Sequence, residues 1–408
     1  MAAILADLRG LTPLAETNAY ADPQAVYTRL RAEWGEVAPI ELEPGINAWL
    51  VMGHEELVHV VRHERLFSKD STIWTPYAEG RIREESPLRT FVYPRPNVFF
   101  TDGEEHRKYR TPLEDAIGSL RLRQVSHHVR DLCSDLISAF SERGSADLLM
   151  EYCLTIPAVV VGRLLGMDLE TARTMHGTLL EMFMFDAKAG NEKFEKILMN
   201  LVWARASEPA KDMTSVIVHH QNISSPEDAM HSMVMLISAA AEGTMTWIAG
   251  ALLLMLTDPR FAGRMRGGRL DIDDALDEVL WRNPPFSNLL GRYVTRDTEL
   301  GGQALRQGDA VVMSFAAANA DPRVHAADPW EELGNRAHVS WSAGPHVCPA
   351  QIPARLIVRE AVEAALNQLP GLRLSVPPDE VGRLGSPWSS VPATLPVEFT
   401  PVPAKTRA

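Results

Sequence analysis

The chain has 408 residues, of which 46% are hydrophobic and 23% are charged, and its formal net charge is -13. This composition is that of an ordinary globular protein with a large core. The acidic balance, with no strongly basic tract, argues against a nucleic-acid polymer as a partner. Cys133, Cys153 and Cys348 are too few and too scattered for a disulfide framework or a zinc site, which favours a reducing cytoplasm. The first ten residues lack the basic-then-apolar order of a signal peptide.

The N-terminal part of the chain predicts short elements that follow a loosely ordered segment, residues 1–20. Hydrophobic periodicity predicts a helix over 26–33, a strand over 48–52 and a helix over 55–63. Residues 74–100 contain four prolines and several aromatic residues without a regular period. We therefore expect a long loop there, and a loop of that length inside a compact domain is usually functional.

The rest of the chain is predicted to be mainly helical. Apolar residues recur at helical spacing from about 106 to 266, and a further helix is predicted over 274–283. Short strands are predicted at 292–294, 310–313 and 395–399. No internal repeat or low-complexity linker appears, which favours a single domain.

One segment, 233–256, is long and apolar enough to resemble a membrane span. Glu242 interrupts it, small and polar residues such as Gly243 and Thr244 weaken it, and no basic residues flank it closely. A long helix buried in a protein core is the better interpretation, so we expect no membrane association.

The motif with the most chemical content is Trp341-Ser342-Ala343-Gly344-Pro345-His346-Val347-Cys348-Pro349-Ala350. Cys348 follows a Gly/Pro turn and precedes a run with helical spacing, 352–366. Its thiolate would face the positive end of that helix dipole, which favours the deprotonated form that binds metals. His346 could reach toward the same ligand. An isolated cysteine is more often a small buried hydrophobic residue, so the surrounding residues decide between the two interpretations.

These residues resemble the haem-binding loop of cytochrome P450, the haem-thiolate oxygenase family, whose pattern is F-G-x-G-x-H/R-x-C-x-G. Gly344, His346 and Cys348 stand at the matching offsets, whereas the family's Phe and two of its glycines are replaced. The resemblance extends from about residue 21 to 399. It implies a mainly α fold with small β-sheets, a helix-rich triangular prism around a buried haem b, in one domain over 1–408. Cys348 would be the axial thiolate ligand of the iron.

The resemblance also implies which residues bind the haem propionates. His106 and Arg110 match the start of the family's H-x-x-x-R helix, and their spacing of four places them on one helical face. Taken alone, such a pair more often marks a solvated basic turn. Arg292 matches the family's propionate arginine, and His346 would be the fourth anchor.

The family's helix motif E-x-x-R is altered, because it is replaced here by Glu278-Val279-Leu280-Trp281. Arg282, four residues after Glu278, could form an ion pair with it on the same helix. The second arginine of the family's triad should lie near 328–332, where Glu331 stands. Both arginine positions are changed together, which suggests a rewired core, since an unpaired buried Glu278 would be costly.

The oxygen-activating motif A-G-x-[D/E]-T-T is also altered and becomes Ala240-Ala241-Glu242-Gly243-Thr244-Met245. The resemblance implies Thr244 and Glu242 as the catalytic residues. Glu242, however, lies one position, about 100° around the helix, from the usual acid. Either this shift favours chemistry other than plain hydroxylation, or Glu242 or a water molecule serves the same proton path.

With a tryptophan at the arginine position of the E-x-x-R motif, the chain resembles a small set of actinobacterial family members. Some of these are encoded beside signalling operons, and others couple cyclodipeptides oxidatively. We therefore expect radical C–C or C–N coupling of a tryptophan-containing cyclodipeptide with a second diketopiperazine or a nucleobase such as guanine. The alternatives are a conventional monooxygenase that hydroxylates a polyketide, terpenoid or peptide, and a haem-binding signalling protein with little turnover.

The substrate-binding residues can be predicted only from family position. They come from the long loop, the helix near 182–185, the central helix and the late strands: Trp74, Val92, Phe185, Ala241, Asn288, Leu289 and Trp388. The Met/Phe run at 182–185 more often marks a helical core than a binding surface. Aromatic walls with few charges suit a flat, mostly apolar ligand with a few amide groups, such as a cyclodipeptide, and equally suit many polyketides.

No flavin domain or Gly-rich dinucleotide motif is present, so electrons for dioxygen activation must come from NAD(P)H through a ferredoxin and a ferredoxin reductase. A basic patch could receive an acidic ferredoxin, although surface cations are usually only solvated. Its members would be Arg107, Lys108, Arg121, Arg123 and Arg336. We expect a monomer that acts on a small-molecule substrate.

Pro349 directly follows the predicted iron ligand and has no backbone N–H, whereas N–H groups at this place normally donate to the thiolate. Fewer hydrogen bonds to sulfur leave more electron density on iron and lower its reduction potential. Pro349→Leu is therefore expected to raise the haem reduction potential, measured by spectroelectrochemistry. An unchanged or lower potential would indicate that Pro349 only fits the turn.

Overall fold

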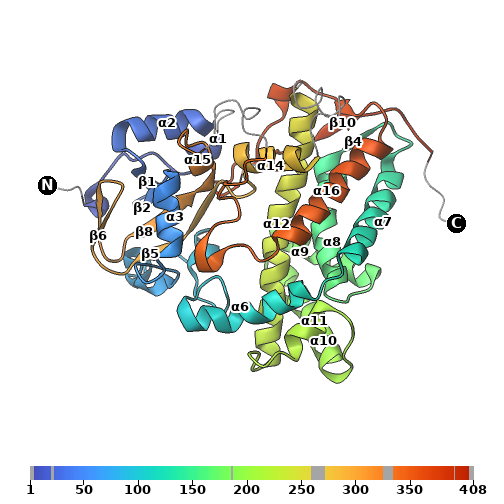
Figure 1. The fold of residues 1–408 in the computed structure, drawn as a ribbon, viewed down its shortest axis with the longest axis horizontal. Coiled ribbons are helices and arrows are strands. Elements are labelled where there is room, and N and C mark those ends of the chain that lie inside the picture. Colours follow the sequence, from blue (N-terminus) through green and yellow to red (C-terminus); the bar gives the residue numbers. More distant parts are fainter. Residues whose placement is uncertain are drawn as a thin grey trace. The chain divides into compact units, whose positions relative to one another are not determined.

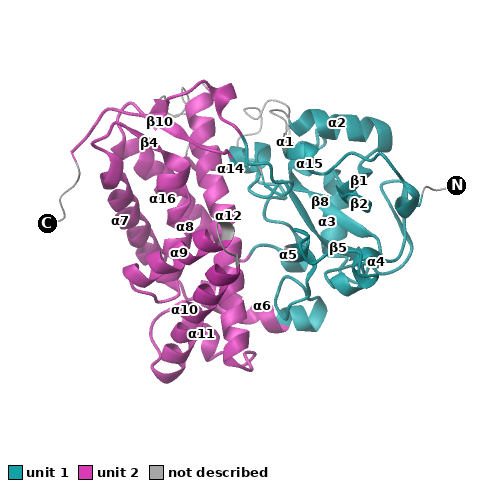
Figure 2. Cartoon of the chain, turned by 180° about the vertical axis from the view of Figure 1, so that it is seen from behind, with its two compact units in different colours: residues 1–107, 277–348, 383–391 teal, residues 108–276, 349–382, 392–408 magenta. Residues whose placement is uncertain are grey.

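The computed structural model describes residues 4–19, 23–184, 187–258, 272–324, 334–389 and 391–403. Its contacts divide the chain into two compact units, which Figure 2 shows in different colours. Unit 1 comprises 1–107, 277–348 and 383–391, and unit 2 comprises 108–276, 349–382 and 392–408. The expected single domain over 1–408 stays a prediction.

Unit 1 is built on a five-stranded sheet with the strand order β1-β2-β8-β5-β3 (Figure 1). The strands are β1 (Val37–Glu43), β2 (Ile46–Val51), β3 (Phe67–Ser68), β5 (Asn288–Val294) and β8 (Ala310–Ser314). Strand β2 pairs in parallel with β8 and antiparallel with β1, and β5 pairs antiparallel with β8 and with β3. A separate hairpin consists of β6 (Thr298–Leu300) and β7 (Gln303–Leu305). The strands expected at 48–52, 292–294 and 310–313 are confirmed.

Both faces of this sheet are buried, as the alternation of side chains along β2 shows. Ala48 and Leu50 pack into one apolar cluster, whereas Trp49 and Val51 pack into a second one. Successive residues of a strand point to opposite faces, so the two clusters cover the two sides of the sheet. Unit 1 therefore has a core of its own.

The helices of unit 1 are short, and two of them confirm the helices expected at 26–33 and 55–63. They are the 3-10 helices η1 (Leu5–Asp7), η2 (Ser71–Ile73) and η5 (Gly344–His346) and the α-helices α1 (Glu16–Ala19), α2 (Pro23–Trp34), α3 (His54–Arg62), α4 (Thr75–Ala78), α5 (Arg89–Val92) and α15 (Phe315–Asn319). The N-terminal segment expected to be loosely ordered contains η1 and α1, and Leu14 in it is buried. The long loop expected at 74–100 contains α4 and α5 and is otherwise irregular.

Unit 2 is mainly helical, as the periodicity of its sequence predicts. Its helices are α7 (Leu122–Phe140), the π-helix η3 (Leu149–Cys153), α8 (Thr155–Leu164), α9 (Leu169–Met184), α10 (Ala187–Ser207), α11 (Met213–Val218), α12 (Pro226–Thr257), α16 (Gln351–Gln368) and the 3-10 helix η6 (Pro378–Glu380). A three-stranded sheet joins β4 (Ser145–Asp147), β10 (Pro396–Glu398) and β9 (Arg373–Leu374), which confirms the strand expected at 395–399. Two further helices, α6 (Gly103–Gly118) and α14 (Ile272–Arg282), begin in one unit and end in the other.

The central helix of unit 2 is α12, which contacts α8, α10 and α16 (Figure 1). It begins with a capped first turn, because the Ser225 side chain accepts a hydrogen bond from the Asp228 backbone N–H and Pro226 follows the cap. Among the described residues it is the one helix that is long and apolar enough to cross a membrane, and half of its most apolar window is buried. A soluble core helix passes the same test, so this finding agrees with the expected core helix.

The altered E-x-x-R motif lies on α14, where the structure supplies a local partner for the acid. Glu278 is buried, and the Arg282 Nε donates to its Oε1 at 2.5 Å. The expected ion pair within the helix is therefore confirmed, and it explains how the carboxylate is stabilised without the family's arginine. Glu331, which stands near the family's second arginine position, lies outside the described residues.

Trp281 occupies the family's arginine position and makes a different set of contacts. It is 3% exposed, and its indole Nε1 donates to the Asn335 backbone oxygen at 2.9 Å. Its ring meets the edge of the His338 ring, with 5.5 Å between centroids and 83° between planes. The indole therefore connects α14 to the segment that precedes residues 341–350, which we call the cysteine loop.

Trp281→Phe tests this connection, because it keeps an aromatic ring and removes the N–H that binds Asn335. Losing one hydrogen bond to this partly buried carbonyl should lower the free energy of unfolding by about 0.5–1.5 kcal/mol, seen as a lower urea midpoint. The control is Trp203→Phe at a side chain that is 55% exposed, where we expect a change within about 0.5 kcal/mol. Equal effects of the two substitutions would contradict the role given to Trp281.

Candidate functional site

The cysteine loop is closed by its own backbone. The Cys348 N–H donates to the Trp341 carbonyl at 2.9 Å, and the Ser342 N–H donates to the Val339 carbonyl at 2.7 Å. Ser342 has φ 60° and is the one non-glycine residue with a positive φ in the described part of the chain. It stands where the family pattern has its first glycine, so the left-handed backbone is kept although the residue has changed. Cys348 itself is partly exposed and forms no disulfide.

Gly344 lets this loop approach helix α3 closely. Its φ is +66°, and a Cβ added there would lie 2.6 Å from the Val61 carbonyl oxygen. Real Cβ atoms essentially never come that close to a backbone oxygen, so a larger residue would push the loop away from α3. The match of Gly344 to the family pattern therefore has a physical cause.

Two histidines meet beside the loop. His346 belongs to η5 and His106 to the first turn of α6, and their ring centroids are 4.0 Å apart. The His346 Nε2 lies 3.7 Å from Asp102 Oδ1. The other carboxylate oxygen of Asp102 accepts hydrogen bonds from Ser68 Oγ at 2.6 Å and from the Lys69 backbone N–H at 2.7 Å. Asp102 thus links β3, α6 and the cysteine loop.

A bulge in strand β5 positions Arg292 at the same place. The pairing of β5 with β8 shifts register between Leu290 and Arg292, and Gly291 between them has φ +124°. Such a bulge redirects the following side chain. The Arg292 guanidinium, 1% exposed, donates from Nη1 to the Phe67 carbonyl at 3.2 Å and lies 3.7 Å from Asp102 Oδ1.

Burial lowers the pKa values of the bases in this cluster more than the neighbouring carboxylates raise them. Burial lowers the pKa of Arg292 to about 10, against the opposing effects of Asp102 and Glu64. Burial, together with the neighbouring cations, lowers the pKa of His346 to about 3 and the pKa of Lys69 well below its ordinary value. Burial alone would raise the pKa of Asp102, but contacts with His346, Ser68 and the Lys69 backbone, with the Arg292 charge, hold it below its usual value. A further anion would stabilise the charged forms of these bases.

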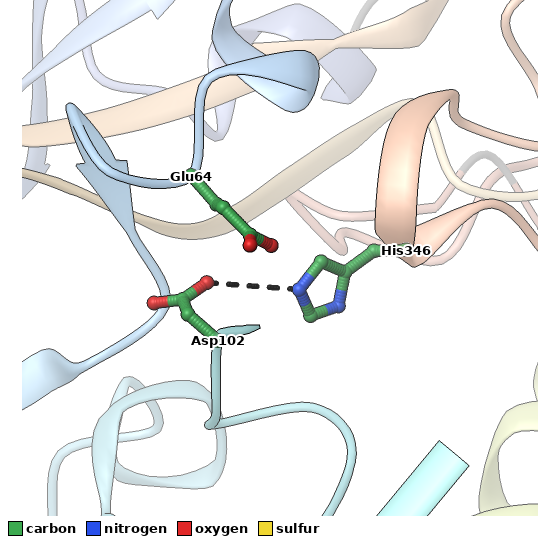
Figure 3. A group of neighbouring side chains, drawn as sticks. All are labelled: Glu64, Asp102 and His346. Carbon is green, nitrogen blue, oxygen red and sulfur yellow. Dashed lines mark ion pairs between the residues drawn. The ribbon is translucent and has the colours of Figure 1, made fainter. Parts of the chain in front are cut away.

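Figure 3 shows Glu64, Asp102 and His346 pointing toward one another, and their ligand atoms lie within 4.8 Å of each other. These residue types could hold a cation. Arg292 lies beside the same carboxylate, however, and its positive charge disfavours a metal ion there. The Arg292 Nε and the His346 Nε2 have no hydrogen-bond partner in the described chain, and a carboxylate ligand would supply acceptors to both.

The cluster therefore fits the propionates of haem better than a metal ion. His106, Arg292 and His346, all expected anchors, are brought together in unit 1, and Cys348 is two residues from His346 in the same loop. The protein residues that would hold haem are thus these three bases and the Cys348 thiolate.

The other predicted haem and catalytic residues belong to unit 2. Arg110 is 9% exposed, and its Nε donates to Glu114 Oε1 at 2.7 Å, four residues along α6. On α12, Thr244 is buried, Ala241 is half-buried and Glu242 is exposed, so the acid and the threonine face different surroundings. Their roles stay predictions.

Several predicted substrate residues are buried and pack against other side chains of the core. Trp74 and Val92 were expected to contact the substrate, but both are 0% exposed in the core of unit 1, where Trp74 packs on Tyr293 at 5.9 Å between centroids. Family position could not show that the loop folds these side chains inward. Both side chains pack in this core, and their contact with a substrate stays a prediction.

Asn288 is also fully buried, and its amide donates to Thr17 Oγ1 at 3.0 Å and to the Pro387 carbonyl at 2.9 Å. These bonds join β5 to the N-terminal segment and to residues 386–388, and the predicted contact of Asn288 with a substrate stays a prediction. Leu289, its neighbour, is partly buried against the second apolar cluster.

Trp388 is the expected aromatic that keeps some exposed surface, at 9%, and it packs on the partly buried Phe91 with 4.6 Å between ring centroids. Phe185 lies outside the described residues. Sequence reasoning missed Asp102 and Lys69 as members of the site. The position of Asp102 directly before the helix that carries His106 was a usable signal, whereas nothing in the sequence marked Lys69.

Gly344→Ala should disturb the cysteine loop, and Gly10→Ala is its matched control. Both glycines have φ +66°, but a Cβ at Gly10 would meet nothing within 4 Å. The left-handed backbone alone costs about 1–2 kcal/mol for alanine, so both variants should lose that much stability. Gly344→Ala should lose more and should retain several-fold less haem, measured as the haem-to-protein ratio after purification. Equal haem content in the two variants would contradict the close approach to α3.

The chain is similar to known proteins over nearly its whole length. No family model matches the chain. It is 29% identical over 399 residues to nocardicin C N-oxygenase from Nocardia uniformis subsp. tsuyamanensis, which covers 93% of this chain and 98% of that protein. It is 25% identical over 393 residues to the cytochrome P450 monooxygenase PikC from Streptomyces venezuelae, over 93% of this chain and 91% of that protein.

The fold is also that of solved cytochrome P450 structures. The testosterone-bound CYP154C4 from Streptomyces sp. ATCC 11861 superimposes with a TM-score of 0.85 at 23% identity, over 96% of this chain and 99% of that one. Haem held by a cysteine thiolate is the cofactor that these relatives imply, and the buried bases beside the cysteine loop are arranged to receive it. The chain is therefore similar to bacterial cytochrome P450s over nearly its whole length, and its fold is the cytochrome P450 fold.

Proposed function

We propose that this cytochrome P450 couples a tryptophan-containing cyclodipeptide oxidatively with a second diketopiperazine or a nucleobase such as guanine, by forming a C–C or C–N bond. The observation that carries the proposal is Trp281, which replaces the family's arginine while Arg282 satisfies Glu278. The altered motif is thus part of an intact core, as expected for the coupling members of the family that it resembles. When bound, haem supplies the centre at which dioxygen is activated.

Each predicted residue has one role in this proposal. Cys348 would ligate the iron, and His106, Arg110, Arg292 and His346 would bind the propionates. Thr244 and Glu242 on α12 would hold and transfer the protons that the reduction of dioxygen consumes, and the exposed position of Glu242 gives its carboxyl group access to solvent.

The proposed reaction balances without inserting oxygen into the product. Joining one C–H or N–H position to another removes two hydrogen atoms from the substrates. Dioxygen takes up these two, together with two electrons and two protons from the redox partner, and leaves as two water molecules. The product therefore has the summed mass of both substrates less two hydrogens.

An aromatic pair supports a flat substrate. Phe91 and Trp388 come from segments far apart in the sequence and pack together with 4.6 Å between ring centroids. Phe91 is partly buried, and Trp388, in the same apolar cluster as Trp74, is 9% exposed. Aromatic rings favour offset or edge packing with another ring, which suits an indole or a purine. The same fold occurs in CxnD, described as a cytochrome P450 for C–S bond formation in chuangxinmycin biosynthesis, at a TM-score of 0.81 and 24% identity over 96% of this chain and 98% of that one.

The second candidate is a conventional monooxygenase acting on a polyketide, terpenoid or peptide. It is favoured by Thr244, which keeps the family's position on α12, and by relatives such as nocardicin C N-oxygenase, whose name describes oxygen transfer. A signalling protein with little turnover has no such support, because these relatives are named as enzymes.

The electron donors in the proposal are a ferredoxin and its reductase, and the place of action is the cytoplasm. The basic patch offered for docking is partly engaged within the chain, since Arg107 pairs with Glu104 at 2.7 Å and Arg336 with Asp277 at 2.8 Å. Such ion pairs reduce the net positive charge that an acidic partner would meet.

Turnover with a substrate panel tests the proposal. Cyclodipeptides that contain tryptophan should give type I difference spectra, and those without it should not. Incubation with ferredoxin, reductase, NADPH and guanine should give products at the summed mass less two hydrogens. Cys348→Ser is the control, since it should abolish both the thiolate band of the reduced carbon monoxide spectrum and the turnover. Products that gain one oxygen and no partner mass would favour the monooxygenase instead.

A further inference from the structure

Lys69 is a buried cation without an anionic partner. It is 4% exposed, and within the described chain its Nζ forms no hydrogen bond or ion pair. Its ammonium lies over the face of the Phe99 ring, 3.8 Å from the centroid. A ring face attracts a cation, but this attraction is much smaller than the cost of taking an ammonium group out of water.

Lys69 lies beside Asp102 and Gly291, in the same cluster as the predicted propionate ligands Arg292 and His346. Its backbone N–H donates to Asp102 Oδ2 at 2.7 Å, directly after strand β3. Its Nζ lies 3.1 Å from the point where a Cβ on Gly291 would be. Gly291 is the bulge residue that directs Arg292 toward Asp102, so the two long cations lie on neighbouring positions of one site.

This arrangement is unfavourable unless an anion is added. Burial and the Arg292 charge both lower the pKa of Lys69, and Asp102 opposes them only in part. An apolar side chain would pack in the same space without desolvating a charge. A lysine here is therefore explained by a ligand with a negative charge, and not by packing.

We propose that Lys69 is a further haem-propionate ligand, which donates from its ammonium group to the carboxylate that Arg292 and His346 also bind. The proposal rests on haem binding and is independent of the substrate and of the bond that is formed. Hydrogen bonds between an ammonium and a carboxylate are about twice as strong as neutral ones, so Lys69 should add to haem retention. A positive charge beside the haem also stabilises the reduced iron relative to the oxidised iron.

Lys69→Met removes the charge and keeps a flexible side chain of similar length. Haem transfer from the purified ferric enzyme to excess apomyoglobin should become about tenfold faster, as expected for losing one charged hydrogen bond. The reduction potential of the haem should fall. Lys211→Met is the charge-matched control at an exposed lysine, and it should change neither quantity.

Phe99→Leu separates binding from packing, because it removes the ring that Lys69 covers and leaves the charge in place. If Phe99→Leu reproduces both effects of Lys69→Met, Lys69 acts by packing and the proposal is wrong. If Lys69→Met behaves like Lys211→Met, the proposal is also wrong. The reduced carbon monoxide spectrum of every variant should keep the thiolate band, which shows that haem is bound and that a negative result concerns Lys69 alone.

Discussion

The candidate site depends on one electrostatic constraint, the burial of several bases around two carboxylates, Asp102 and Glu64. Arg292, His346 and Lys69 are held there by three different elements: a bulged strand, the cysteine loop and the end of β3. Each base loses hydration when it is buried, and the interaction with Asp102 offsets only part of that cost. A ligand with carboxylates would supply acceptors to Arg292 Nε and His346 Nε2 and would stabilise the charged forms of the buried bases.

The sequence predicted most regular elements and the residues carried by the family motifs, because both are encoded locally. Helical and strand periodicity located α2, α3, β2 and β8, and the motif spacing located His346 and Cys348. It could not predict that Trp74 and Asn288 are used in the core, since burial depends on contacts between distant segments. Lys69 was missed for the same reason, because its significance arises only from the bulge at Gly291.

Two departures from the family pattern are compensated by the backbone or by a neighbour. Ser342 replaces a glycine but keeps the left-handed conformation, so the loop geometry survives. Trp281 replaces an arginine, and its hydrogen bond to Asn335 keeps a link between α14 and the later segment. A motif search that scores residue identity counts both as mismatches, whereas the structure shows a left-handed turn at one position and a buried hydrogen-bonded side chain at the other.

The ion pair between Glu278 and Arg282 has a consequence for how the chain folds. Both residues lie on α14 and are four positions apart, so the pair can form as soon as that helix does. A partner from a distant segment would become available only after the intervening chain had been synthesised and its loop closed. During synthesis on the ribosome, Glu278 can therefore pair with Arg282 before the C-terminal part of the chain has been made.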